Sequence, residues 1–189
     1  MTREDYSIAA LAADLRRLRA ECPDEHRLLA AVRPLALRAA NASHLWLSHR
    51  MFTPDPEQGF SLFPLAEEDD HSLAVFAISW LPDRGTPPHD HGTWAVIAGV
   101  EGPEWNSFWR RQDDKTRPGF AKLEQVGTKT FNPGEVLAMP SGTIHQVWNK
   151  TDSVSVSLHI YGMHINHTGR SQFDVENCVE RAFVTKVEK

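Results

Sequence analysis

The sequence contains little cysteine. Only Cys22 and Cys178 among its 189 residues carry a thiol, and they lie far apart in the chain. They form no Cys-x-x-Cys pair, which excludes the usual cysteine-based metal and redox motifs. So few cysteines favour a reducing compartment, and the sequence alone leaves open whether these two form a disulfide.

An excess of positive charge and long apolar segments are also missing. The chain carries 20 Lys and Arg residues against 25 Asp and Glu, a formal net charge of −5. Without a basic excess, nucleic acid is not an expected partner. No apolar run approaches the roughly 20 residues that cross a bilayer, and the start, Met-Thr-Arg-Glu-Asp, lacks the pattern of a signal peptide. We therefore expect a cytoplasmic protein with no membrane partner.

Residues 5–40 show helical periodicity. Apolar side chains recur at three- and four-residue steps, first at Ile8, Leu11, Leu15 and Leu18, then at Leu28, Leu29, Val32 and Leu35. Pro23 is expected to end the first helix and Pro34 to bend the second. We predict a helical layer on the outside of a β-rich domain. Three histidines in or just after it are predicted to be surface or capping residues: His26, His44 and His49.

From Leu45 onward, short β-rich runs alternate with Gly, Pro and Asp. The predicted runs are Leu45–Leu47, Phe60–Phe63, Leu73–Trp80, Trp94–Ala98, Ser107–Arg110, Lys129–Phe131, Val136–Met139, Gln146–Trp148 and Val154–Tyr161. Many short strands predict an all-β sandwich or barrel over residues 45–165, with 166–189 as a C-terminal extension of one domain spanning 1–189. The polar stretch Gln112–Phe120 is expected to be an exposed hairpin loop, kept solvated by its charges.

Three histidines have the spacing of a metal site. If Pro87–Gly92 is a strand, His89 and His91 point to the same face and can reach one ion, while Asp90 points away as a structural residue. His145 is the candidate third ligand, because glycines and a proline mark a turn between two apolar runs just before it. Imidazole ligands favour mid-series divalent metals, so iron, zinc, copper, nickel and manganese all stay open.

The residues around His145 resemble a known family. Gly134, Pro140, Gly142, His145 and Asn149 match the second motif of the cupin superfamily, G-x5-P-x-G-x2-H-x3-N, at every fixed position. The first cupin motif is matched in part: Gly102 is in place, but Ala95 stands where a Glu ligand is usual. The resemblance implies a cupin double-stranded β-helix, a jelly-roll-like barrel, with a metal held by three histidines and no carboxylate.

Within the cupins, this ligand set together with the segment Ser157-Leu-His159-Ile-Tyr161 resembles the thiol dioxygenases, which include cysteine dioxygenase and 3-mercaptopropionate dioxygenase. The resemblance implies Fe(II) as cofactor and the oxidation of a small thiol by O₂ to its sulfinic acid. It also implies that Tyr161 polarises or protonates an oxygen intermediate, that His159 orients Tyr161, and that Ser157 holds His159 in one tautomer. Three neutral ligands leave the full charge of the ion, which favours an anionic thiol acid as substrate.

Arg170 is the candidate cation for the substrate carboxylate. It follows Tyr161 by nine residues, the spacing found in 3-mercaptopropionate dioxygenases. The segment Gly59–Phe63 has no Arg of the kind that animal cysteine dioxygenases use, and no cysteine is placed for their Cys–Tyr cross-link. The resemblance is therefore closest to the bacterial 3-mercaptopropionate type, although Ser61 stands near a position where those enzymes tend to place Gln.

Other interpretations stay open at this point. The Ser-His-Tyr segment also fits a buried polar ladder that only satisfies its own hydrogen bonds. The chain also fits a three-histidine cupin oxygenase acting on a non-thiol substrate such as a diketone, or a non-catalytic metal-binding or sensing cupin. Which thiol is the substrate and the oligomeric state remain open. So does whether four further polar residues line the pocket, namely Glu104, Asn106, His164 and His167.

Overall fold

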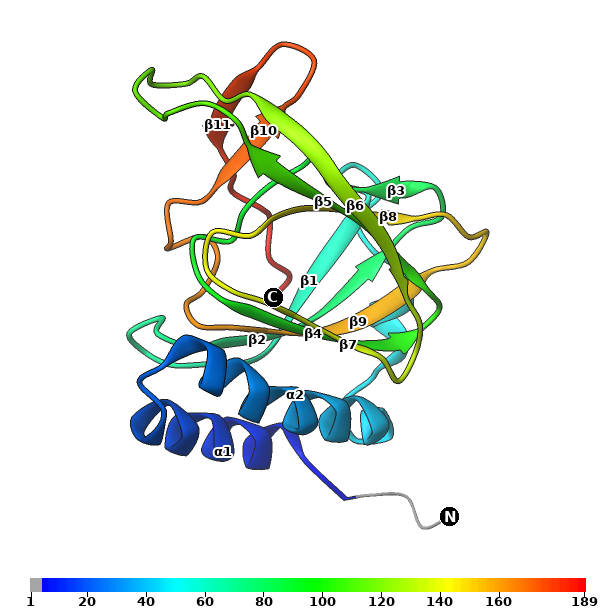
Figure 1. The fold of residues 1–189 in the computed structure, drawn as a ribbon. Helices are drawn as coiled ribbons and strands as arrows, with labels where there is room; N and C mark the ends of the chain where they lie inside the picture. The colour runs from blue at the N-terminus through cyan, green and yellow to red at the C-terminus, as the bar shows by residue number, and fades with distance from the viewer. Residues whose placement is uncertain (1–4) are drawn as a thin grey trace.

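The computed structural model describes residues 5–189, which form two helices packed against two facing antiparallel β-sheets (Figure 1). One sheet has the strand order β1-β2-β9-β4-β7 and the other the order β3-β8-β5-β6. The strands are β1 Phe60–Glu67, β2 Ala74–Trp80, β3 Arg84–Gly85, β4 Ala95–Glu101, β5 Glu104–Arg111, β6 Leu123–Phe131, β7 Val136–Met139, β8 Ile144–Asn149 and β9 Ser155–Tyr161. A separate hairpin pairs β10 Ser171–Asp174 with β11 Val179–Ala182. The predicted all-β barrel with an N-terminal helical layer is confirmed.

The helical layer lies where the apolar periodicity predicts it. Helix α1 spans Ile8–Glu21 and α2 spans Glu25–Asn41. Figure 1 shows α2 against β4 and β7, with α1 beside α2. Asp24 caps α2 by accepting a hydrogen bond from the backbone N–H of Arg27 at 2.9 Å. The stripes at Leu11, Leu15 and Val32 are fully buried. No helix in residues 5–189 is long and apolar enough to cross a membrane.

Strand β9 is buried on both faces because it lies between the helices and the barrel interior. Its residues Val156, Leu158 and Ile160 point outward, and the latter two pack under the helices. The alternating residues point inward, so the polar side chains of Ser157, His159 and Tyr161 share the interior face. The helical layer thus explains why a strand that carries these polar residues is otherwise so apolar.

Several strand predictions need correction. The predicted run Leu45–Leu47 is wrong, because Ser43–Leu45 continues the helical path as a 3₁₀ turn and the indole of Trp46 donates to the Ala39 carbonyl. The Pro87–Gly92 segment is not a regular strand either, and His89 forms only isolated bridges there. Strands β3, β10 and β11 were not predicted, since each is four residues or shorter and carries little periodicity.

The connection between β5 and β6 is the predicted hairpin loop. Its charged side chains form ion pairs as well as keeping the loop solvated. Arg111 pairs with Asp113 at 3.0 Å and with Glu180 of β11 at 2.8 Å. Both members of the Arg111–Asp113 pair are largely buried, and the guanidinium also donates to the Phe120 carbonyl. The ion pairs therefore tie this loop to the C-terminal hairpin.

The C-terminal residues close one end of the barrel. After β11 the chain runs back beside β1, where Val187 bridges Leu62 and the backbone N–H of Glu188 donates to the Leu62 carbonyl. Phe183 packs into the interior apolar cluster together with residues of β1, β2, β4 and β8. The segment expected as an extension is therefore part of the wall around the predicted metal site.

Candidate metal centre

A two-residue backbone bridge brings the first and third histidines together. The N–H of His89 donates to the His145 carbonyl at 2.8 Å, and the N–H of His145 donates to the His89 carbonyl at 2.9 Å. Residues that exchange both hydrogen bonds lie directly opposite each other, with side chains on one face. His91 follows two residues later, just before Gly92, whose φ of +64° marks a sharp turn. The three side chains therefore converge, although their segment is not a strand.

The ligand atoms of His89, His91 and His145 all lie within 4.8 Å of one another, and all three residues are buried. The Nε2 atoms of His91 and His145 are 3.1 Å apart. His89 donates from Nδ1 to the Pro87 carbonyl, and His145 donates from Nδ1 to Asn106 Oδ1. The Nε2 atom of each ring therefore carries a free lone pair that can bind a metal ion. Burial lowers the pKa of His89 and His91 well below the usual range and that of His145 to about 3, so all three are neutral near pH 7.

These residues fit a transition metal ion. Nitrogens bound at about 2.1 Å to neighbouring positions of one ion lie about 3 Å apart, close to the His91–His145 separation. Neutral imidazoles suit iron, zinc, copper and nickel rather than Mg²⁺ or Ca²⁺. Ala95, where the family motif has Glu, is buried beside Tyr161 and offers no ligand atom. Among residues 5–189 the cluster is thus a three-histidine metal site without a carboxylate.

Beside the histidines, three side chains of β9 form a hydrogen-bonded chain. The Tyr161 hydroxyl lies 2.8 Å from His159 Nδ1, and His159 Nε2 lies 2.8 Å from Ser157 Oγ. Burial raises the pKa of Tyr161 above its ordinary value and lowers that of His159 to about 3. His159 is therefore neutral and Tyr161 keeps its proton near pH 7. Their roles in catalysis stay predictions.

Acid is expected to destabilise the metal-free protein because its buried histidines are neutral. Such a histidine has a pKa of about 3 in the folded protein and about 6.5 in the unfolded chain. Below pH 6.5 the unfolded chain therefore binds a proton that the folded protein does not. The contribution of this histidine to the free energy of unfolding is complete above that pH and is lost as the pH falls toward about 3. The free energy of unfolding should fall by about 1.4 kcal/mol per pH unit for each such histidine. Urea titrations between about pH 7 and pH 5 measure this slope. His159→Gln should make it shallower, whereas replacing exposed His49 should not; equal slopes in all three proteins would contradict the assignment.

The hydrogen-bonded chain of Tyr161, His159 and Ser157, called the β9 chain from here on, continues into residues that the sequence leaves unassigned. Ser157 Oγ donates to Glu104 Oε2 at 2.7 Å, and Asn106 Nδ2 donates to Glu104 Oε1 at 2.9 Å. Since Asn106 Oδ1 accepts from His145, the buried Glu104–Asn106 pair joins a metal ligand to the β9 chain. Neither residue lines the cavity. In the sequence, the one sign that Glu104 and Asn106 point inward together is that they flank Trp105 at the start of β5, because alternate strand residues share a face.

Arg170 is buried beside the metal site and lines the cavity. Its Nε donates to the Phe183 carbonyl at 3.1 Å, one terminal nitrogen donates to Thr185 Oγ1 at 3.0 Å, and the guanidinium stacks on the Phe183 ring. Burial lowers its pKa to about 10, so it remains charged at neutral pH. Within residues 5–189 it forms no ion pair with a carboxylate; Asp90 acts on it only at longer range.

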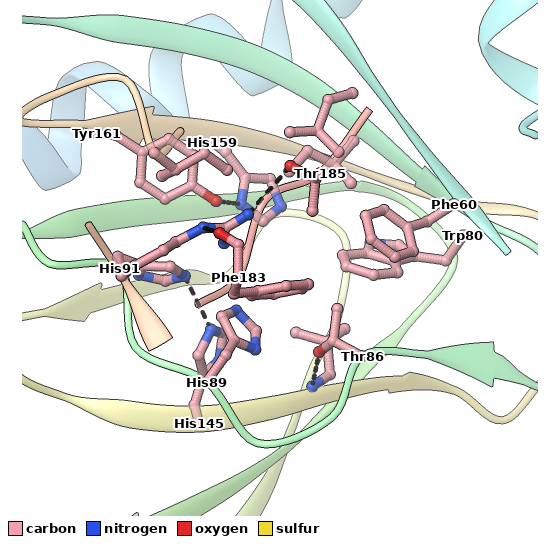
Figure 2. A pocket seen from close by; sticks show the side chains of 15 residues that line it. Phe60, Trp80, Thr86, His89, His91, His145, His159, Tyr161, Phe183 and Thr185 are labelled. Carbon is pink, nitrogen blue, oxygen red and sulfur yellow. Dashed lines mark hydrogen bonds between the residues drawn. The ribbon is translucent and has the colours of Figure 1, made fainter. Parts of the chain in front are cut away.

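The cavity between these groups is small, about 20 Å³. Figure 2 shows Tyr161 and His159 across from His89 and His145, with Phe183 of the C-terminal segment between them. The rest of the wall is mainly apolar and includes Phe60, Leu62, Ile78, Trp80, Thr86, Val147, Ile165 and Thr185. Sequence reasoning missed Phe183 and Thr185, because nothing in the chain's periodicity indicates that its end folds back over the barrel.

Other candidate residues lie away from the cavity. Ser61 points to the opposite side of β1, where its hydroxyl donates to Glu188. His164 packs on Phe76, and His167 stacks on His71 at the surface. Asp90 accepts a hydrogen bond from the Ser171 backbone and has the structural position expected for it. His26, His44 and His49 are exposed, as predicted.

No protein-family model matches the chain. Solved structures with a similar arrangement include oxalate oxidase in complex with glycolate, with 13% identity and a TM-score of 0.46 over 62% of this chain and 59% of that one. They also include a cupin superfamily protein from Desulfitobacterium hafniense (16% identity, TM-score 0.40, 56% and 78% covered). A third is the cupin domain of a transcriptional regulator from Enterobacter cloacae (14% identity, TM-score 0.39, 55% and 96% covered).

The chain spans less than two thirds of the oxalate oxidase chain. These scores lie below 0.5 and say nothing about the reaction, and the fold is read from the two facing sheets themselves. Together the two facing sheets and the three-histidine cluster indicate a metal-binding β-barrel protein.

Proposed function

We propose that this protein is an Fe(II)-dependent dioxygenase that oxidises a small thiol carboxylic acid to its sulfinic acid with O₂. One observation carries the proposal: one cavity is bordered by three neutral histidines, by Tyr161 and by a buried Arg170 that has no carboxylate partner among residues 5–189. Candidate substrates are 3-mercaptopropionate, cysteine or a related thiol acid.

The ligand set favours a substrate that supplies negative charge. Iron held by His89, His91 and His145 would supply sites for a thiolate and for activation of O₂. Three neutral ligands and Arg170 leave the cavity strongly positive, and Coulomb attraction in such a buried site favours a thiolate with a carboxylate on the same molecule. A diketone would bring less charge to this site.

The protein's own residues would then orient the substrate. Arg170 has N–H groups beyond those that bind Phe183 and Thr185, and these suit a carboxylate. Tyr161 is held by His159 with its oxygen in the cavity, which places a hydrogen-bonding group next to the reacting sulfur. The apolar wall and the C-terminal segment exclude water.

Oxygen uptake by protein reconstituted anaerobically with Fe(II) tests the proposed reaction. The substrates to compare are L-cysteine, 3-mercaptopropionate, mercaptosuccinate and cysteamine. We expect uptake with at least one thiol acid and one sulfinate formed per O₂ consumed. No uptake with any of them in iron-loaded protein would contradict the proposal. Uptake with a diketone instead would point to a different oxygenase, and tight binding without turnover to a sensing cupin.

Replacing Arg170 with lysine should separate carboxylated from uncarboxylated thiols. A point charge does not reproduce a bidentate guanidinium contact, so the KM for 3-mercaptopropionate should rise about 10-fold or more. The KM for cysteamine, which has no carboxylate, should change little. Arg181→Lys, at an exposed position of β11, is the matched control. Equal KM changes for both thiols would show that Arg170 serves only to hold the C-terminal segment.

A further inference from the structure

The β9 chain does not end at Ser157. It runs from the cavity through Tyr161, His159 and Ser157 to the carboxyl group of Glu104, with successive contacts of 2.8, 2.8 and 2.7 Å. Each group on the way can donate and accept a hydrogen bond. Glu104 is the only member whose ordinary pKa lies well below neutral pH, whereas Tyr161 has a raised pKa and His159 is neutral.

The groups around Glu104 shift the pKa of its carboxyl group in opposite directions. It is buried at the start of β5, and burial raises its pKa, while Asn106 and Ser157 lower it by donating hydrogen bonds. From β2 the indole N–H of Trp80 also favours the anion, although it lies outside hydrogen-bonding geometry. From β9 the titratable neighbour is His159, whose Nε2 is 3.9 Å away. No Lys or Arg of the described chain forms an ion pair with Glu104.

An ionised Glu104 fixes the direction of every hydrogen bond in the chain. Ser157 must then donate to Glu104, so its oxygen accepts from His159 Nε2–H. His159 Nδ1 is left as an acceptor for the Tyr161 hydroxyl, and Tyr161 therefore presents lone pairs to the cavity. This differs from the expectation that Tyr161 donates a proton there. It places a hydrogen-bond acceptor at the point where a thiol would arrive.

We propose that Glu104 is the final acceptor of the substrate thiol proton, which reaches it through Tyr161, His159 and Ser157. This inference rests on the proposed function. The S–H bond breaks and its electron pair stays on sulfur, while the proton binds Tyr161 Oη. The original Tyr161 proton moves to His159 Nδ1, and the Nε2 proton of His159 moves to Ser157 Oγ.

The Ser157 proton then moves to Glu104 Oε2. Each relay group ends with as many protons as it had, Glu104 gains one, and the substrate becomes a thiolate. The transfer is favoured because the anion moves from a carboxylate remote from the positive centre to a sulfur atom next to it. Glu104 acts only through the chain and does not touch the substrate.

Counting protons during substrate binding tests the proposal without turnover. 3-Mercaptopropionate is added anaerobically to Fe(II)-loaded protein in weakly buffered solution, and proton release is followed with a pH indicator. Thiol binding to a metal ordinarily releases about one proton per site. The wild-type protein should release far less, because Glu104 keeps the proton. Glu104→Gln, which cannot accept it, should release about one per thiol bound.

Difference infrared spectra give a second, direct measurement on the same samples. Binding of 3-mercaptopropionate to the wild-type protein should produce the carbonyl stretch of a protonated carboxyl group. This band should be absent in Glu104→Gln and in Ser157→Ala, which keeps Glu104 but breaks the second and third contacts of the chain. Ser157→Ala also serves if Glu104→Gln does not fold. Glu180→Gln, at the ion pair with Arg111, should behave as wild type.

The outcomes separate this inference from the proposed function. If 3-mercaptopropionate binds and is oxidised, but wild-type protein releases a full proton and shows no carboxyl band, the role of Glu104 is wrong and the function stands. If none of the thiols compared for oxygen uptake binds the iron-loaded protein, the proposed function fails and the inference with it.

Discussion

Replacing His145 with alanine is expected to abolish metal retention. His145 is one of the three ligands found among the described residues, it is almost fully buried, and its Nε2 lies 3.1 Å from that of His91. With two ligands left, no other His, Cys or carboxylate within residues 5–189 completes the cluster. The iron content after dialysis should fall from about one per chain to near zero, and oxygen uptake should be lost with it.

A graded series makes this prediction sharper. Asn106→Ala leaves all three ligands in place but removes the acceptor that orients His145, together with a donor to Glu104. Loss of such an outer partner typically lowers metal affinity about 10–100-fold. The order of iron affinity should therefore be wild type, then Asn106→Ala, then His145→Ala. His49→Ala changes an exposed histidine and should retain iron fully. Unchanged iron content in folded His145→Ala protein, judged by circular dichroism, would remove His145 from the site.

Replacing Tyr161 with phenylalanine is expected to lower kcat by about 10²-fold or more, the usual size of a proton-transfer or hydrogen-bonding contribution at a reacting atom. The ring keeps its packing against His91 and Phe76, so iron content and stability should change little. Only the hydroxyl that contacts His159 and lies in the cavity is lost. Rates at saturating thiol and iron content measured on the same sample check both parts.

The chain offers a matched control for that variant because it has only two tyrosines. The Tyr6 hydroxyl donates a hydrogen bond to Asp14 of α1. Its ring belongs to the apolar cluster between the helices and the sheet and does not line the cavity. Tyr6→Phe should leave kcat unchanged. If Tyr161→Phe turns over as fast as Tyr6→Phe, then Ser157, His159 and Tyr161 are a structural ladder that only satisfies its own hydrogen bonds.

Much of the candidate site follows from spacing along single segments. Alternation along one strand is enough to put Ser157, His159 and Tyr161 on one face, because successive strand residues point to opposite sides. The two-residue spacing of His89 and His91 also brings them together, although their segment is not a strand, since both flank one residue held against β10. Such local relations are encoded in neighbouring residues and need no knowledge of the partner strand.

Relations between distant segments do not follow from spacing. Asn106 and Glu104 link His145 to Ser157 only because β5 lies beside β8 and faces β9 across the barrel. The same reasoning applies to Phe183 and Thr185, which reach Arg170 by a chain reversal after β11. Nothing in the composition of residues 166–189 indicates that fold-back, which is held on β1 by the bridge between Val187 and Leu62 and by the backbone hydrogen bond from Glu188 to Leu62.

The sequence by itself determined the helical layer, the β-rich barrel and the three histidines, because periodic burial and the ligand preference of imidazole are local properties. The tertiary structure alone decided that Ser61, His164 and His167 lie outside the cavity. It also decided that a buried carboxyl group stands behind the β9 chain and that the C-terminal segment closes the site. Each of these depends on which strands meet across the barrel, and strand pairing between distant segments is set by the packing of the whole core rather than by neighbouring residues.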